Sequence, residues 1–218
     1  MGTFPVIELI EKRPDLIKEI LISSSYDDKE NLINSLEEKN IPFNIDDKSI
    51  NRIAKKGNVY LVGVFNKEYG IIKEGNHILL DRPSNMGNLG TIIRTMLGMG
   101  FENLAICGDA CDYFDPKVIR ASMGAFFKVN IQHFDSLESY NKIFSDNELY
   151  LFMLGESSLL DIKTAGKFTL CFGNEGSGLD SSVKSLGRPV MIPQSSQVDS
   201  LNLPVSVALG MFYFTQII

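Results

Sequence analysis

Long apolar runs are missing from this chain. No stretch approaches the ~20 consecutive apolar residues that a membrane-spanning helix needs. The first residues, from Met1 to Lys12, mix acidic, basic and apolar side chains without a small-residue cleavage site, so we expect no secretory signal. Cysteine is also scarce, because Cys107, Cys111 and Cys171 are too few and odd in number for a disulfide framework. We therefore expect a soluble protein of a reducing compartment, the cytoplasm.

Positive charge is in short supply as well. The chain has 21 Lys and Arg against 27 Asp and Glu, which gives a formal net charge of −6. This balance disfavours a nucleic-acid partner that needs a broad basic face. Apolar residues are plentiful, at 44% of 218 residues with 14 Phe, so the chain can fill at least one core and is not disordered.

The first third of the chain predicts a small α/β unit. The expected elements are helix-like spacing from Val6 to Ile20 interrupted at Pro14, a short strand from Leu21, helices near Leu32–Leu36 and Ser49–Lys55, and a strand over Val59–Phe65. The charged stretch 66–76, which contains two glycines, is the expected domain boundary. It divides the chain into domains over residues 1–75 and 76–218.

Beyond residue 76 the pattern changes to short apolar runs separated by segments with helical spacing. The runs are His77–Leu80, Leu104–Cys107, Leu149–Leu154, Phe168–Phe172 and Val190–Ile192. Strands without polar alternation are typical of a parallel sheet covered on both faces, and their alternation with helices indicates the α/β class. The final stretch, Val205–Ile218, is apolar on nearly all sides, so we expect it to be buried in its own subunit or against a partner.

Three segments could carry chemistry, and the first is Ser84–Gly100. It follows the strand expected to end at Asp81 and leads into a helix on which Arg94 lies off the apolar stripe. The loop residues Asn85, Gly87, Asn88 and Gly90 could adopt unusual backbone angles and present amides. The alternative is a simple Asn cap followed by an amphipathic helix with a solvated Arg.

The second segment is Leu170–Asp180, in which a buried strand runs into a glycine-rich loop. Glycines 173, 176 and 178 allow a ligand to approach the backbone closely. Neither the Walker loop nor the dinucleotide pattern matches, and Glu175 would repel a phosphate. An adenosine or a sulfonium suits this loop better, and the alternative is a tight strand-to-helix turn.

The third segment is Pro189–Val207, a short strand followed by a polar loop and the start of the last helix. Ser200 and Asn202 are natural cap residues, and Pro204 is tolerated in a first helical turn. Helix capping alone could explain these three residues.

Taken in order, the segments resemble the signature motifs of the SpoU/TrmH family of RNA ribose 2′-O-methyltransferases, in the SPOUT superfamily. Asn88–Thr95 is similar to the first motif, Phe172–Leu179 to the second, and Ile192–Pro193 with Ser200–Ala208 to the third. Ile119–Ala125 looks like the Ser-x-Gly-Ala segment of the family. Residues 1–75 resemble more loosely the ribosomal-protein-like RNA-binding domain of many members, although the usual Gln-Gly pair is absent.

The resemblance implies an α/β fold with a C-terminal α/β-knot, a deep trefoil knot around a mostly parallel sheet, preceded by the small RNA-binding domain. Physical rules alone would not propose a knot. The implied cofactor is S-adenosylmethionine, the implied partner is tRNA or rRNA, and a homodimer would form through the helix over 205–218. The implied cofactor-binding residues are Phe172, Gly173, Asn174, Gly176, Ile192, Ser200 and Leu201.

The implied reaction moves the sulfonium methyl group to a ribose 2′-oxygen, so the protein supplies alignment and help with the hydroxyl proton. The implied catalytic residues are Arg94, Asn88, Glu175, Ser200 and Asn202. A guanidinium normally keeps its proton, so we expect Arg94 to bind the adjacent phosphate and orient the 2′-hydroxyl. Asn88 would hold the substrate or Arg94, and Glu175 would orient Arg94 or stabilise charge near the sulfonium.

Three other readings stay open: a catalytically silent RNA-binding or assembly protein on the same knot, a SPOUT enzyme that methylates a base, and an unrelated nucleotide-binding protein. The histidines are isolated, and Cys107 and Cys111 lack a second ligand cluster, so no metal is implied. Because neither domain is basic overall, RNA must contact a local patch. One candidate is Lys48, Arg52, Lys55 and Lys56, which could equally be a solvated helix face.

Overall fold

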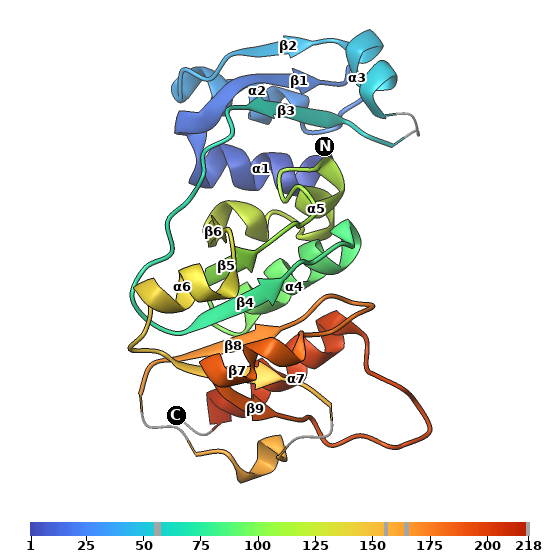
Figure 1. The fold of residues 1–218 in the computed structure, drawn as a ribbon. Helices are drawn as coiled ribbons and strands as arrows, with labels where there is room; N and C mark the ends of the chain where they lie inside the picture. The colour runs from blue at the N-terminus through green and yellow to red at the C-terminus, as the bar shows by residue number, and fades with distance from the viewer. Residues whose placement is uncertain (55–57, 155–156, 164–165, 217–218) are drawn as a thin grey trace.

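Two β-sheets organise the chain, seen in a computed structural model that describes residues 1–54, 58–154, 157–163 and 166–216 (Figure 1). The smaller sheet has the order β2-β1-β3, with β2 parallel and β3 antiparallel to β1. Its elements are α1 (Thr3–Lys12), the 3₁₀ turn η1 (Pro14–Leu16), β1 (Ile17–Ile22), α2 (Lys29–Glu38), β2 (Phe43–Ile45), α3 (Asp47–Ala54) and β3 (Leu61–Phe65).

The expected helical spacing as far as Ile20 is wrong beyond Pro14. Residues Ile17–Ile22 form β1, which pairs with a strand on each side. Ile20 and Ile22 are fully buried in a cluster with Leu36 and Leu61. The β-branched side chains and the pairing on both edges outweigh the helix-like spacing, which the proline had already interrupted.

The larger sheet has six parallel strands in the order β6-β5-β4-β8-β7-β9. The strands are β4 (His77–Asp81), β5 (Asn103–Cys107), β6 (Asn130–Phe134), β7 (Glu148–Phe152), β8 (Phe168–Phe172) and β9 (Arg188–Val190). The other elements are α4 (Met86–Gly98), α5 (Pro116–Ala121), η2 (Ala125–Lys128), α6 (Leu137–Ile143), η3 (Leu159–Asp161), η4 (Ser181–Leu186) and α7 (Leu203–Gln216). Four of the five apolar runs form strands, as expected, but of the fifth, Val190–Ile192, only Val190 lies in β9. The missed strand, β6, is at the edge of the sheet, with only Ile131 and Phe134 buried.

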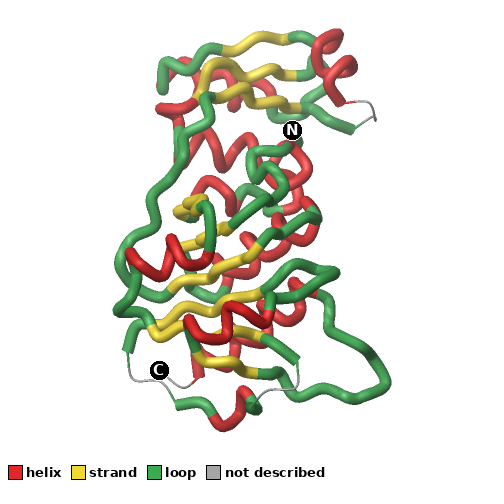
Figure 2. Tube along the Cα trace, viewed as in Figure 1, coloured by secondary structure: helices red, strands yellow, loops and turns green. Residues whose placement is uncertain are grey.

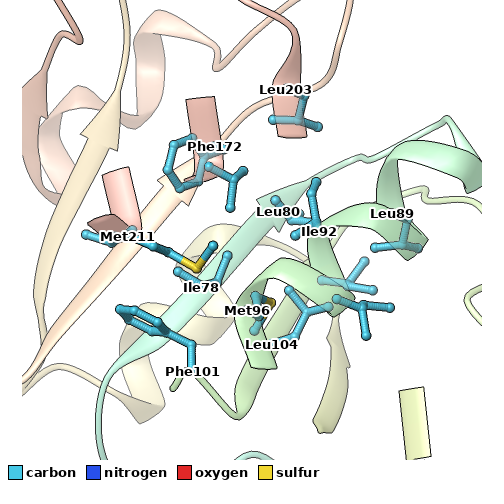
Figure 3. Close-up of a cluster of buried hydrophobic side chains, with 14 of the residues drawn as sticks. Ile78, Leu80, Leu89, Ile92, Met96, Phe101, Leu104, Phe172, Leu203 and Met211 are labelled. Carbon is cyan, nitrogen blue, oxygen red and sulfur yellow. The ribbon is translucent and has the colours of Figure 1, made fainter. Parts of the chain in front are cut away.

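Helices cover both faces of this sheet, as the apolar runs predict. On one face α4, α5 and α7 pack on Ile78, Leu80, Leu104 and Phe172. Figure 3 shows the side chains of α4 and α7 in this cluster. On the other face α6 and η4 pack on the alternate strand residues, among them Leu79. Because helices cover both faces, water is excluded from the strands, and a ligand can reach the sheet only at the ends of the strands.

Helix α7 is apolar on nearly all sides, but only one of its faces is buried within this subunit. Gly210 lies so close to β7 and β8 that a Cβ there would be 2.9 Å from the Phe152 ring and 3.0 Å from the Phe172 ring. Val205, Leu209 and Phe212 on the opposite face are 47%, 41% and 56% exposed. In the part of the chain that the structure describes, no helix is long and apolar enough to cross a membrane.

The two sheets are joined by the extended segment 66–76, visible as a long loop in Figure 2, and by a packing contact. Helix α1 lies against the turn before η2, where Gly124 has a φ of 86° and a Cβ would be 2.6 Å from Cγ of Glu8. The Glu8 carboxylate pairs with Nζ of Lys128 at 2.7 Å. A side chain at position 124 would therefore push the small sheet away from the large one.

Candidate active site

A pocket of about 480 Å³ opens at the edge where the parallel strands end. In parallel sheets the carboxyl ends of all strands lie at one edge, and ligands bind there. The loops after β4, β8 and β9 meet at this edge. The pocket is lined by residues 152–154, 172–179, 191, 192, 194, 199–201, 203 and 206.

The loop after β8 folds back on itself and forms one wall of the pocket. A Cβ on Gly173 would lie 2.1 Å from the carbonyl carbon of Gly178, so only glycine permits this approach. The amide of Gly178 donates to the carbonyl of Asn174 at 2.9 Å. Oδ1 of Asn174 accepts from the amides of Gly176 and Ser177 at 2.9 and 3.2 Å. Asn174 thus holds the loop together from inside.

The side chain of Glu175 ties this loop to the start of α4. Its Oε2 accepts from the amide and the hydroxyl of Ser84 at 3.1 and 2.8 Å. Its Oε1 accepts from the amide of Asn85 at 3.1 Å and from Nδ2 of Asn88 at 3.3 Å. Partial burial by itself would raise the pKa of Glu175, but the hydrogen bonds from Ser84 and Asn85 outweigh it and the pKa is lowered.

Asn85, and not Asn88, is the N-cap of α4. Its side chain accepts from the amides of Gly87 and Asn88 at 2.9 and 3.0 Å, and the helix begins at Met86. The loop expected from Asn85 to Gly90 is therefore helical after its first residue. Asn88 does not cap the helix, and its side-chain amide donates to Glu175 instead.

Gly90 is needed for packing rather than for a turn. A Cβ at this position would lie 2.5 Å from Cβ of Ala121 and 2.5 Å from the carbonyl of Val118, both on α5. The absent side chain lets α4 and α5 approach each other closely. The Ser-x-Gly-Ala segment thus contacts the first motif directly.

Arg94 lies on α4, exposed to solvent and away from the residues that line the pocket. It is about 9 Å further along the helix axis than Asn88 and turned by about 240°, which places it on the side of Gly90. Among the described residues nothing forms an ion pair with its guanidinium. Glu175 is occupied by Ser84, Asn85 and Asn88, so an interaction with Arg94 stays a prediction.

The third segment forms the opposite wall of the pocket. Ile192, Ser200 and Leu201 line it, as do Phe172, Gly173, Asn174 and Gly176, so every residue expected to hold a cofactor lies at the pocket. Asn202 is exposed outside the lining, and its carbonyl accepts from the amides of Val205 and Ser206 at 2.9 and 3.0 Å. Pro204 is the second residue of α7, in the first turn as expected.

The sequence analysis missed part of the lining. Phe152, Met153 and Leu154 reach the pocket because β7 lies between β8 and β9, an order that no sequence pattern indicates. Lys48 and Arg52 are exposed on α3 of the small sheet and do not line the pocket. Lys55 and Lys56 lie outside the described residues.

Comparison with known proteins gives a consistent set of relatives. The SpoU rRNA Methylase family matches residues 75–212. An uncharacterized tRNA/rRNA methyltransferase of Synechocystis is 33% identical over 139 residues, 62% of this chain and 51% of that protein. The 23S rRNA (uridine(2479)-2′-O)-methyltransferase of Streptomyces viridochromogenes is 30% identical over 57% of this chain and 47% of its own length. The chain spans about half the length of these curated relatives.

Solved structures match nearly the whole chain. An AdoMet-bound rRNA methyltransferase from Sinorhizobium meliloti has a TM-score of 0.84 at 24% identity, covering 99% of this chain and 85% of that one. The SpoU methyltransferase AviRb from Streptomyces viridochromogenes has a TM-score of 0.83 at 21% identity, covering 99% and 87%. At these identities the likeness shows the shared α/β fold with its six-stranded parallel sheet.

Proposed function

The chain belongs to the SpoU rRNA methylase family, and from that premise we propose that it transfers a methyl group from S-adenosylmethionine to a ribose 2′-hydroxyl of tRNA or rRNA. The observation that carries the proposal is the position of Glu175. Its carboxylate joins the glycine loop of the pocket to the start of α4, which bears Asn88 and Arg94. Residues about 90 positions apart in sequence thereby meet at one strand edge.

The pocket suits S-adenosylmethionine in size and chemistry. Its volume of about 480 Å³ is in the range of small-molecule sites. Gly173 lets the loop fold back closely enough to form one wall, and Phe172 and Leu201 supply apolar contact. Among the described residues that line it there is no lysine or arginine, and Glu175 is present, which favours a cationic ligand over a phosphate. Phe172, Gly173, Asn174, Gly176, Ile192, Ser200 and Leu201 would hold the cofactor.

When bound, S-adenosylmethionine supplies an electrophilic methyl group on a sulfonium. The protein's own residues then align the ribose and assist the departure of its 2′-hydroxyl proton. Arg94 would bind the neighbouring phosphate with its planar fork and orient the hydroxyl. Glu175 would fix Asn88 and the helix start, and Ser200 and Asn202 would complete the site.

The proposal extends to the organisation of the chain. Residues 1–75 would be an RNA-binding domain, with Lys48 and Arg52 among its contacts, and residues 76–218 would be the methyltransferase domain folded as a deep trefoil knot. Packing of α7 across β7 and β8 at Gly210 is in keeping with a threaded C-terminus. The exposed apolar residues Val205, Leu209 and Phe212 support a homodimer through α7.

Two measurements test the proposal. Isothermal titration should show S-adenosylmethionine binding to the full chain, and the purified protein should move labelled methyl from it to unmodified rRNA or tRNA transcripts. A catalytically silent scaffold would bind RNA without any transfer. Absence of both cofactor binding and transfer would refute the proposed function.

A further inference from the structure

Many cationic side chains in the structure are neutralised by a carboxylate. The cations in ion pairs include Arg13, Lys67, Arg82, Lys128, Lys167 and Arg188. On helix α5, Lys117 and Arg120 are both exposed, and neither pairs with a carboxylate within the described ranges of the chain. Three residues apart on a helix, they share one face.

Two carboxylates just before this pair in the sequence, and one beside the turn that follows α5, are already engaged. Asp115 caps α5, and its Oδ1 accepts from the amide of Lys117 at 2.7 Å. Asp112 pairs with Lys67 at 2.8 Å. Glu8 pairs with Lys128 at 2.7 Å. The charges of Lys117 and Arg120 therefore stay available to an anion from outside.

These two side chains lie on the helix that packs against α4. The close approach at Gly90 places Ala121, the neighbour of Arg120, against α4. Arg94 is one turn beyond Gly90 and within about 40° of it around the helix, so it lies on the side of α4 that faces α5. Lys117, Arg120 and Arg94, none of which pairs with a carboxylate of the described residues, thus lie on two helices in contact.

The same surface continues to α1. Figure 1 shows α5 between α1 and α4, on the side of the molecule where the loop after β8 projects. The pKa of the Met1 amino group is lowered, first by burial and second by the nearby positive charge of Arg120. Two apolar residues near the contact between α1 and Gly124 are exposed. They are Met123, just before Gly124, at 39%, and Phe4, on α1, at 67%. Cations beside exposed aromatic side chains, here Phe4, are typical of surfaces that bind single-stranded nucleic acid.

We propose that Lys117 and Arg120 on α5 bind the phosphate backbone of the RNA substrate and, with Arg94, lead it along α4 and α5 to the pocket edge. This inference rests on the proposed function and adds an RNA-contacting role for Lys117 and Arg120, which the motifs do not assign. Phosphate binding by exposed cations gives affinity and register without reading sequence. The α3 patch and the α5 surface would then hold two stretches of one RNA.

The test compares a double variant, Lys117→Gln with Arg120→Gln, with a control, Lys142→Gln with Lys163→Gln. Lys142 and Lys163 are also exposed and form no ion pair with the described residues. Filter binding with unmodified 23S rRNA and tRNA transcripts is measured from 50 to 300 mM salt, together with KM and kcat for methyl transfer. Titration with S-adenosylmethionine measures cofactor affinity and so checks that the pocket is intact in each variant.

The α5 variant should bind RNA more weakly at every salt concentration, and its plot of log K against log salt should be shallower by about 1.5, which corresponds to two lost phosphate contacts. KM for RNA should rise while kcat and cofactor affinity stay at the wild-type level. The control should match the wild type. Equal RNA affinity and salt slope in both variants would overturn the inference while leaving the methyltransferase proposal intact. A wild-type protein that binds the cofactor but no RNA would overturn both.

Discussion

Replacing Gly173 by alanine is the sharpest test of how the pocket is built. The added Cβ would lie 2.1 Å from the carbonyl carbon of Gly178 and 2.3 Å from the amide nitrogen of Leu179, where ordinary contacts are 3.4–4 Å. Both neighbours are backbone atoms, so no side chain can rotate away. The loop must open by about 1 Å, the order of the shortfall in these contacts.

Two effects contribute to the loss of stability expected for Gly173→Ala. Overpacking of a tight site costs about 1–3 kcal/mol, and the hydrogen bond from Gly178 to Asn174 contributes about 1 kcal/mol that is lost as the loop opens. We therefore expect a loss of about 2–4 kcal/mol in the free energy of unfolding, or roughly 1 M in the urea midpoint. Because this loop forms a wall of the pocket, S-adenosylmethionine binding should disappear with it.

Gly176 in the same loop provides the control. A Cβ there would be 3.5 Å from Oδ1 of Asn174, an ordinary contact, so Gly176→Ala should unfold at the wild-type urea concentration. Urea denaturation followed by circular dichroism and titration calorimetry measure the two effects. If Gly173→Ala is as stable as Gly176→Ala and still binds the cofactor, the backbone contact does not shape the site.

Further variants test the other parts of the site. Arg94→Ala should lower single-turnover methyl transfer by roughly 100-fold or more while leaving cofactor affinity unchanged, because Arg94 lies outside the pocket lining; retained transfer would remove Arg94 from the mechanism. Glu175→Gln should destabilise the start of α4, since one amide nitrogen would face backbone donors. Hydrogen bonding lowers the pKa of Glu175 in the folded protein, so its contribution is present above about pH 4.3 and is lost as the pH falls through the folded value. Urea midpoints between pH 3 and 7 should therefore fall less steeply for Glu175→Gln than for the wild type. Phe212→Asp should yield monomers in sedimentation, and a monomeric wild type would contradict the dimer.

Sequence patterns predicted the parallel sheet because its strands are apolar on both faces. They failed at β1, where pairing with two neighbouring strands decides the conformation of Ile17–Ile22. They also failed at β6, whose polar residues Asn130, Gln132 and His133 carry little apolar signal on an edge strand. Local spacing describes each segment alone, while strand pairing is decided by partners far along the chain.

The residues that the motifs predict to hold a cofactor all line the pocket, but the motifs did not predict how the site residues are connected. Glu175 was expected to orient Arg94 or to stabilise charge near the sulfonium, and the contacts found are Ser84, Asn85 and Asn88. Sequence cannot show which of two asparagines, Asn85 or Asn88, caps α4 and which faces the loop after β8. That choice depends on where the helix begins, and helix boundaries are the least determined part of a local pattern.

The position of the transferred methyl group tests the central claim most directly. The full chain is incubated with trideuteriomethyl S-adenosylmethionine and unmodified rRNA and tRNA transcripts, and the RNA is digested to nucleosides for mass spectrometry. The account predicts that the deuterated methyl group appears on ribose, as a 2′-O-methyl nucleoside. Deuterated methyl on a base, or unlabelled RNA from a protein that binds the cofactor, would contradict it.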